Sequence, residues 1–416
     1  MKILIPETLQ RNVLSAVRSL GRAGHRITLA LPVEPGRLRL RARFASRYVE
    51  RVVFIQSPHL SPSGYVRDLL ELVADGHFDV LLPFTHAGVL PVSYHKEALS
   101  AYVRIPIADY TVLRQAHDKL ETVHIAQRVG VLTPVTFHPA SRDELLSLRE
   151  HVPFPCLVKA RQGCGVGTTI RFAKNFEELV AGYDEIDGQV SVPPVNDYSH
   201  PIIQEYVPGQ IHDAVFLYSR GECKAALTQE RVITYPVQGG VGAVNRTTDD
   251  PLVRKLGQTL LDAMGWHGPA QVEFRLDPRD GQHKLLEINP KFWGTLPLAI
   301  VAGIDFARMS CELAYHGDLE SAFDYRVGIT YRWLFSGELY ALVQQPTRER
   351  LRKFLDFRQA NTYYDWDLRD PLPDLPRAVA SIGTVFFARK RILPPRQDLN
   401  ALAMQRPPAQ RSALAV

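Results

Sequence analysis

Residues 269–295 read GPAQVEFRLDPRDGQHKLLEINPKFWG, and this segment carries the clearest structural signal in the chain. Two apolar, strand-like runs flank the turn sequence 278–281, which predicts a β-hairpin. The first run contains Glu273, the second contains Glu287, and Asn289 follows two residues later. Because side chains alternate between the faces of a strand, the hairpin should bring both carboxylates and the amide to one face. Two acids and an amide oxygen form the hard, oxygen-rich site that Mg²⁺ prefers while it holds phosphate.

A purely structural interpretation of this hairpin is that the two acids pair with cations on a sheet face. Arg275 and Lys291 are available as partners. However, Glu287 is flanked by Leu286 and Ile288, and a glutamate inside such an apolar run is poorly explained as a solvated residue. The metal site is therefore the preferred interpretation.

The composition indicates a globular protein with several domains. The chain has 416 residues, 45% of them hydrophobic, which is enough for two or three packed domains. A net charge of +5 fits an anionic small substrate such as a nucleotide without requiring nucleic acid. The sequence contains no apolar run long enough to span a bilayer and no signal peptide. We therefore expect a cytoplasmic protein that binds neither nucleic acid nor membrane.

The cysteines and histidines indicate no metal site. The four cysteines show no CxxC pairing, so reduced thiols are expected. The fourteen histidines show no metal-ligand spacing, and His267 and His283 are interpreted as incidental.

The first part of the chain, residues 1–108, alternates short apolar runs with helical patterns, which predicts a parallel α/β domain. Its first strand is followed by residues 6–10, which contain no glycine. A dinucleotide pyrophosphate needs glycine there, because the backbone must approach it closely. We therefore expect a scaffold and a wall for a substrate site. The basic run from Arg37 to Arg51 has few aromatic neighbours and is interpreted as a solvated surface.

A glycine-rich segment, Gly163–Thr168, follows shortly after Lys159 at the end of an apolar strand. Backbone N–H groups of such a loop can cradle phosphate oxygens, and the lysine adds a point charge. The loop is not a Walker A sequence, because no Gly-Lys-Ser/Thr follows. An ordinary glycine-rich hairpin with a solvated lysine remains an equal alternative for this segment alone.

A strand at residues 202–209 runs through Glu205 into a turn. Backbone groups at Glu205 and Val207 could pair with the edge of an adenine, while apolar neighbours enclose the ring. Taken alone, an edge strand with a surface glutamate is the simpler interpretation. Asp213 follows closely enough to accept hydrogen bonds from ribose hydroxyls.

A second glycine loop, Gln238–Gly242, has Arg231 upstream. A glycine loop beside an arginine can face a transferred phosphoryl group or a substrate carboxylate. The alternative is a flexible hairpin end.

The order of these motifs resembles the ATP-grasp superfamily over about residues 105–320. The more specific likeness is to predicted carboxylate–amine ligases, which are related to biotin carboxylase and the carbamoyl-phosphate synthetase large subunit. It rests on residues 287–300, EINPKFWGTLPLAI. The resemblance implies an α/β fold, with a Rossmann-like domain before two α+β ATP-grasp lobes and a C-terminal extension. The expected boundaries are 1–108 for the first domain, 109–195 and 196–322 for the two lobes, 323–392 for a mixed region, and 393–416 for a disordered tail.

The resemblance also implies roles for individual residues. The implied ligands of Mg²⁺, or alternatively Mn²⁺, are Glu273, Glu287 and Asn289. The implied ATP-binding residues are Lys119, Lys159, Gly163, Gly165, Gly167, Gln204, Glu205, Tyr206, Val207, His212 and Asp213.

Two further residues are implied to be catalytic: Arg231, where a basic residue often faces the acyl phosphate, and Lys291, with a charge-stabilising role. Lys291 stands where the family commonly has arginine, and it keeps the charge but not the bidentate fork. His212 stands where some relatives carry an acid, which leaves the ribose contact open between His212 and Asp213.

The implied function is an ATP-dependent ligase. A carboxylate attacks the γ-phosphate of ATP, and an amine then attacks the acyl phosphate to form an amide. The expected substrates are a small carboxylic acid and an amine, with amino acids among the candidates, and a homodimer is compatible with this function. Two other classes stay open: a bicarbonate-dependent carboxylase of the same fold, and a non-catalytic ATP-binding regulatory protein.

Overall fold

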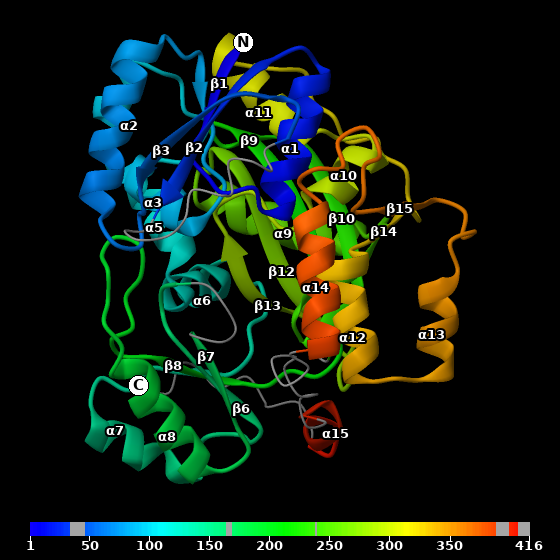
Figure 1. The fold of residues 1–416 in the computed structure, drawn as a ribbon. Coiled ribbons are helices and arrows are strands. Elements are labelled where there is room, and N and C mark those ends of the chain that lie inside the picture. Colours follow the sequence, from blue (N-terminus) through cyan, green and yellow to red (C-terminus); the bar gives the residue numbers. More distant parts are fainter. Residues whose placement is uncertain (34–45, 164–168, 238, 388–398, 407–416) are drawn as a thin grey trace.

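The computed structural model describes residues 1–33, 46–163, 169–237, 239–387 and 399–406. Within these ranges the chain is mixed α/β and is built on three sheets (Figure 1). Most of the basic run, and the glycine loop that contains Gly165 and Gly167, lie outside the described residues. In the part of the chain that is described, no helix is long and apolar enough to cross a membrane.

The N-terminal sheet has four parallel strands in the order β3-β2-β1-β4. The strands are β1 (Lys2–Ile5), β2 (Arg26–Val33), β3 (Val49–Gln56) and β4 (Val80–Leu81). Helices accompany them, as parallel pairing requires crossover connections. These helices are α1 (Arg11–Arg22), α2 (Pro62–Gly76), α3 (His86–Tyr94), α4 (Lys96–Ser100) and α5 (Tyr110–His117). The predicted α/β pattern of this region is confirmed.

A second four-stranded sheet, in the order β5-β8-β6-β7, is antiparallel. Its strands are β5 (Thr136–Phe137), β6 (Cys156–Lys159), β7 (Ile170–Ala173) and β8 (Ile202–Glu205). The nearby helices are α6 (Lys119–Arg128), α7 (Arg142–Ser147), the 3-10 turn η2 (Leu148–Glu150) and α8 (Phe176–Asp187). Two of these helices, α7 and α8, begin with side-chain caps, because Ser141 accepts a hydrogen bond from the Glu144 N–H and Asn175 accepts one from the Glu178 N–H.

The largest sheet has seven strands in the order β13-β12-β9-β10-β11-β14-β15. Its long central strands are β9 (Gln210–Ser219), β10 (Glu222–Tyr235), β11 (Val241–Thr248), β12 (Gly268–Asp277) and β13 (Gln282–Asn289). The helices around it are α9 (Pro251–Ala263), α10 (Leu296–Ala302) and α11 (Phe306–His316). Apolar side chains on its two faces join separate cores, since Phe216 packs with Phe274 while Leu217 packs with Trp293.

The region after residue 323 extends this large sheet. Its strands are β14 (Thr330–Arg332), antiparallel to β11, and β15 (Thr362–Tyr364), parallel to β14. The short π-helix η3 (Leu334–Glu338) and helices α12 (Leu339–Gln344), α13 (Arg348–Leu355) and α14 (Leu375–Phe387) lie along one flank (Figure 1). Arg18 of α1 ties this flank to the N-terminal domain through ion pairs with Asp370 (2.9 Å) and Asp374 (2.7 Å).

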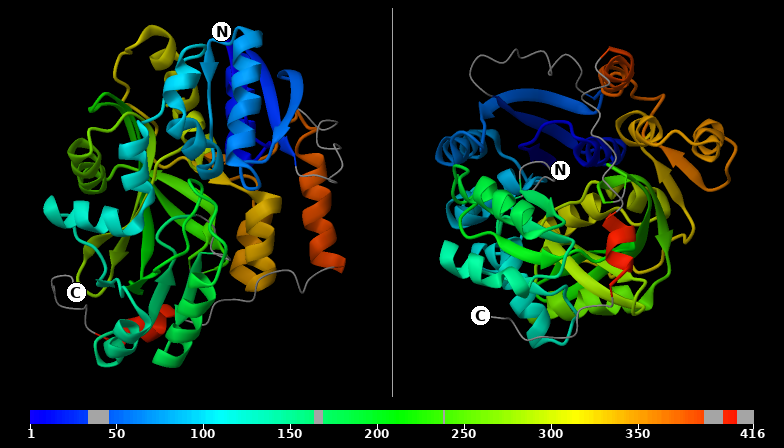
Figure 2. Two further views of the ribbon diagram at one scale, coloured as in Figure 1. Left: turned by 90° about the vertical axis from the view of Figure 1, so that its left-hand side faces the viewer. Right: turned by 90° about the horizontal axis from the view of Figure 1, so that it is seen from below.

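The expected disordered tail is wrong for its central part, because residues 399–404 form helix α15 (Leu399–Met404). Leu399 and Ala403 pack against Tyr206, whose hydroxyl donates to Asn400 Oδ1 at 3.0 Å. Figure 2 shows α15 against the smaller antiparallel sheet. The composition of the segment gave little sign of this helix, since its apolar anchor is a single i, i+4 pair, Leu399 and Ala403.

Candidate nucleotide and metal site

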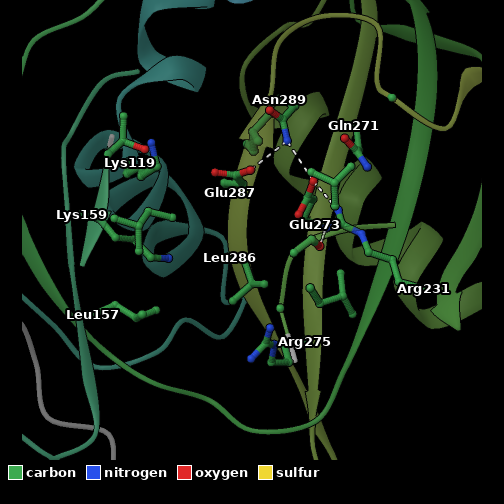
Figure 3. A pocket seen from close by; sticks show the side chains of 18 of the residues that line it. Lys119, Leu157, Lys159, Arg231, Gln271, Glu273, Arg275, Leu286, Glu287 and Asn289 are labelled. Carbon is green, nitrogen blue, oxygen red and sulfur yellow. Dashed lines mark hydrogen bonds and ion pairs between the residues drawn. The ribbon is translucent and has the colours of Figure 1, made fainter. Parts of the chain in front are cut away.

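A cleft of about 290 Å³ lies between the smaller antiparallel sheet and the large sheet. Figure 3 shows the lysines of one side facing the carboxylates of the other across this cleft. Cationic side chains outnumber carboxylates in its lining, which favours a polyanionic ligand. The cations are Arg11, Lys119, Lys159, Arg231, Arg275 and Lys291, and the carboxylates are Glu205, Glu273 and Glu287.

The hairpin of β12 and β13 sets the two cleft carboxylates opposite each other. Glu273 pairs in register with Glu287, and the Asn289 Nδ2 donates to Glu273 Oε1 (3.2 Å) and to Glu287 Oε1 (3.1 Å). The next pair joins Phe274 to Leu285, which leaves Leu286 as the extra residue of a β-bulge. The predicted hairpin and its shared face are confirmed.

The two carboxylates differ in their electrostatic surroundings. Burial raises the pKa of Glu273 to about 7. The negative charges of Asp213 and Glu287 also raise this pKa, whereas the positive charge of Arg231 lowers it. Burial alone would also raise the pKa of Glu287, but Lys119 and Lys159 hold it below its usual range. The repulsion at Glu273 is of the kind that a divalent cation between the two acids would relieve.

The donor set fits Mg²⁺, because it consists of carboxylate and amide oxygens. The Asn289 Nδ2 now faces the acids, while its Oδ1 lies 3.1 Å from His86 Nε2. A half-turn of the terminal amide would present Oδ1 to a cation instead.

Arg231 on β10 holds the other side of Glu273. Its Nη2 lies 2.5 Å from Glu273 Oε1 and 3.1 Å from Asp213 Oδ1. Asp213 also accepts a hydrogen bond from Gln229 Nε2 at 3.1 Å. The carboxylate of Asp213 is therefore committed to protein partners, and it does not line the cleft.

The expected ribose contact by His212 is not supported by the fold. His212 pairs with Phe274, whereas its neighbour Asp213 pairs with Glu273, so the His212 side chain lies on the opposite face of the sheet. There it meets His283, with His283 Nε2 at 3.2 Å from His212 Nδ1.

The two expected phosphate-binding lysines lie on the side of the cleft opposite the carboxylates. Lys119 Nζ donates to the Gly163 carbonyl at 3.1 Å, and Lys159 Nζ donates to Gln204 Oε1 at 2.6 Å. Burial lowers the pKa of Lys159 to about 8, with the charge of Lys119 adding to the effect. Gln204 does not line the cleft, so it positions Lys159 instead of meeting a ligand.

The end of the cleft near residues 205–207 has apolar walls. They are formed by Leu157, Ile170, Phe172, Tyr206, Val207, Ile211 and Leu286. The Val207 carbonyl accepts from Arg275 Nη1 at 2.8 Å, while the Val207 N–H makes no hydrogen bond within the described residues. The Glu205 side chain is buried in an ion pair with Arg279 at 2.6 Å. The Val207 N–H can therefore donate a hydrogen bond to a flat heterocycle bound at this end of the cleft.

Arg11 is a cleft residue that the sequence reasoning missed. It begins α1, donates from Nη1 to the Gly242 carbonyl at 3.0 Å, and stacks 4.6 Å from the centroid of the Trp333 ring. Burial lowers its pKa to about 10, and it has no ion-pair partner among the residues that the structure describes. Its position after the first parallel strand was a usable signal, since ligands of open α/β sheets bind beyond the carboxyl ends of the strands.

His86 and His117 also line the cleft, with ring centroids 4.8 Å apart. Burial lowers the pKa of both histidines, that of His117 to about 3, so both rings are neutral near pH 7. The cleft also contains Gly239 and Gly240 of the second glycine loop. A side chain at Gly240 would collide with the Tyr235 backbone, 2.1 Å from its Cβ position, which explains the glycine there.

Residues 201–336 match the family described as "ATP-grasp in the biosynthetic pathway with Ter operon". The D-alanine–D-alanine ligase of Anaplasma marginale strain Florida is 28% identical over 182 residues, covering 41% of this chain and 51% of the relative. The N-terminal section of the carbamoyl phosphate synthase large chain of Methanopyrus kandleri is 24% identical over 277 residues, covering 64% of this chain and 46% of the relative. The chain therefore spans about half the length of these curated relatives.

Among solved structures, the L-amino acid ligase from Bacillus licheniformis is similar, with a TM-score of 0.57 and 18% sequence identity. The alignment covers 77% of this chain and 75% of that chain. At this identity the likeness concerns the fold alone.

Proposed function

We propose that this chain is an ATP-grasp protein and acts as an ATP- and Mg²⁺-dependent ligase that joins a carboxylate to an amine and releases ADP and phosphate, which the matches above support. One observation carries the proposal: Glu273 and Glu287 lie opposite each other in register and line the same cleft as two buried lysines. The N-terminal sheet would then act as a Rossmann-like domain, and residues 109–195 and 196–322 as the two ATP-grasp lobes.

ATP would lie along the cleft with its base at the apolar end. Leu157, Phe172 and Leu286 would enclose the adenine, and the Val207 N–H would donate to its edge. The triphosphate would then reach Lys119 and Lys159, whose ammonium groups supply charge-assisted hydrogen bonds.

Glu273, Glu287 and Asn289 would hold Mg²⁺, which when bound neutralises phosphate charge. Arg231 would keep the Glu273 carboxylate in place, because its guanidinium bridges Glu273 and Asp213. Lys119 and Lys159 favour the ionised form of Glu287, which is the form that binds a cation.

The reaction has two steps. A carboxylate oxygen of the first substrate attacks the γ-phosphorus, the bond to the bridging oxygen of ADP breaks, and an acyl phosphate forms. An amine then attacks the acyl carbon and loses a proton, the bond from carbon to phosphate oxygen breaks, and phosphate leaves. Positioning and charge neutralisation supply most of the catalysis, because a carboxylate is already nucleophilic.

The chain's own cations suggest where the substrates bind. Arg11 and Lys291 line the cleft and have no ion-pair partner within the described ranges. Two unpaired cations can bind two anionic groups, namely the substrate carboxylate that is activated and a second anionic group. An amino acid as the amine substrate would supply such a group, and Arg11 would hold it.

The test is ADP release from ATP and Mg²⁺ in the presence of mixed pools of carboxylic acids and amines, amino acids included. Release that requires one acid and one amine supports the ligase. Release with bicarbonate alone would identify a carboxylase, and ATP binding without any release would favour a regulatory protein. The Glu287→Gln variant serves as the control for contaminating ATPase activity.

A further inference from the structure

A second group of ligand-type side chains lies outside the cleft, on the opposite face of the large sheet. His212 comes from β9, His283 from β13, and Asp250 is the residue that caps the start of α9. Three elements that are distant in sequence therefore meet at one point. We call these three residues the His-His-Asp cluster.

The distances within the cluster match those between ligands of one metal ion. His283 Nε2 lies 3.2 Å from His212 Nδ1, and Asp250 Oδ2 lies 3.6 Å from His212 Nδ1 and 4.0 Å from His283 Nε2. Tetrahedral ligands with bonds of about 2.0–2.1 Å are separated by roughly 3.3 Å. The three donor atoms thus surround a common point without large rearrangement.

The side chains of the cluster do not provide hydrogen-bond partners for all of their own polar atoms. Asp250 Oδ1 accepts the capping hydrogen bond from the Val253 N–H at 2.9 Å, whereas Oδ2 is too far from both rings for a hydrogen bond. The two facing ring nitrogens can share only one proton. In addition, His283 Nδ1 is buried and has no hydrogen-bond partner within the described ranges. An ion at the centre would use Asp250 Oδ2 and both facing nitrogens together.

The cluster is also accessible. The side chain of His283 is 8% exposed, but those of His212 and Asp250 are 16% and 24% exposed. Solvent can therefore reach the Asp250 side, which provides an entry path and a fourth position for water. The mixed ligand set differs from the oxygen-only set of the cleft, because imidazole nitrogens suit zinc and its transition-metal neighbours while Mg²⁺ prefers oxygen.

We propose that His212, Asp250 and His283 bind a divalent transition-metal ion of the zinc class. The ion joins the start of α9 to strands β9 and β13. Because β13 carries Glu287 and Asn289 on its other face, the ion braces the strand that supports the cleft carboxylates. The site stands independently of the ligase proposal.

The experiment uses the full chain after chelation and dialysis, without nucleotide and with millimolar Mg²⁺ present to occupy the cleft carboxylates. Zn²⁺ binding is followed by calorimetry, and Co²⁺ binding by the intense visible absorption of tetrahedral cobalt. We expect one ion per chain and a rise in melting temperature on adding Zn²⁺. The His212→Ala and His283→Ala variants should each lower the Zn²⁺ affinity at least about tenfold and lose the cobalt spectrum.

Three controls separate this result from alternatives. Asp250→Asn keeps the helix cap, so a lower Zn²⁺ affinity in this variant reports on the ligand and not on the helix. His59→Ala removes an exposed histidine far in sequence from the cluster and should bind Zn²⁺ like the wild type. Glu287→Gln should lose ATP turnover but retain Zn²⁺ binding. Equal Zn²⁺ affinity in the wild type, His212→Ala and His283→Ala, or no cobalt spectrum in the wild type, would overturn the proposal.

Discussion

Glu273 and Glu287 face each other across neighbouring antiparallel strands, and both accept a hydrogen bond from the Asn289 amide, at 3.2 and 3.1 Å. They nevertheless differ in acidity. Burial raises the pKa of Glu273 to about 7, whereas the lysines across the cleft keep that of Glu287 low despite its burial. One carboxylate is thus ionised at neutral pH, and the other titrates there.

This difference predicts how Mg²⁺ binding depends on pH. Glu273 gains its charge as the pH rises through about 7, and a cation binds the charged form. Mg²⁺ affinity should therefore fall as the pH drops from about 8 to 6 and level off above that range. Calorimetric titration of Mg²⁺ in the presence of a non-hydrolysable ATP analogue measures this affinity at each pH. In Glu273→Gln the pH dependence should disappear along with most of the affinity, and a flat profile in the wild type would refute this assignment.

Affinity for the nucleotide should fall as the pH rises, which is the opposite of the pH dependence expected for Mg²⁺. Burial lowers the pKa of Lys159 to about 8, so its ammonium loses charge as the pH rises through that value. Affinity for ATP without Mg²⁺ should decrease above pH 8, and Lys159→Arg, which stays charged, should remove the decrease. Lys159→Met should weaken ATP binding by about 10- to 100-fold, the cost of a charge-assisted hydrogen bond. The exposed Lys255 provides the matched control, and Lys255→Met should bind ATP like the wild type.

Loss of a cleft carboxylate should stop turnover while leaving the fold intact. Glu287→Gln is nearly isosteric and should reduce ADP release by on the order of 100-fold, because charge stabilisation of the transferred phosphoryl group weakens. The measurement is steady-state ADP release with the identified substrates. Glu177→Gln, at an exposed glutamate, should be unaffected. Equal rates for Glu287→Gln and the wild type would show that these acids do not hold the metal.

Arg11 should contribute to binding of the anionic substrate and not to binding of the nucleotide. Arg11→Met keeps much of the packing against Trp333 but removes the charge, so the KM for the anionic substrate should rise at least about tenfold, the value of a charge-assisted contact. ATP affinity should be unchanged. Arg114→Met changes an exposed arginine and is the control. An equal rise in the KM for ATP would place Arg11 at the phosphates instead.

Helix α15 should support the base end of the cleft from behind. Leu399 packs on Tyr206, and Leu157 and Phe172 pack against the same cluster. Leu399→Ser removes a buried apolar side chain whose burial stabilises the packing of α15 by about 1.5–3 kcal/mol. Helix α15 should therefore detach, and ATP affinity should fall severalfold. Leu402→Ser, on the same helix but 38% exposed, should have little effect on ATP binding. If both variants bind ATP equally well, α15 does not influence the site.

Some of this arrangement could be predicted from the sequence because it depends on local rules. Strand alternation and the turn at 278–281 were enough to place Glu273, Glu287 and Asn289 on one face. Side-chain caps open α7, α8 and α9 and depend only on neighbouring residues, as where Asp250 precedes Pro251.

Other features depend on register and packing that the sequence does not contain. The pairing of β9 with β12 decides whether His212 or Asp213 shares the sheet face of Glu273, and a shift of one residue would reverse this choice. The His-His-Asp cluster joins residues from three elements at no recognisable spacing, so the interpretation of His283 as incidental had no local signal against it. Arg11 enters the cleft because α1 packs against α10 and α11, which brings its guanidinium to the Gly242 carbonyl.

The most direct test of the proposed ligase reaction follows one oxygen atom of the carboxylic acid. The identified acid is labelled with ¹⁸O in its carboxylate, and the products of one turnover are analysed by mass spectrometry. We expect one ¹⁸O from each acid molecule to appear in inorganic phosphate and the other to stay in the amide, because an acyl phosphate transfers one carboxylate oxygen to phosphorus. Unlabelled phosphate, or label in AMP, would contradict activation of the carboxylate at the γ-phosphate.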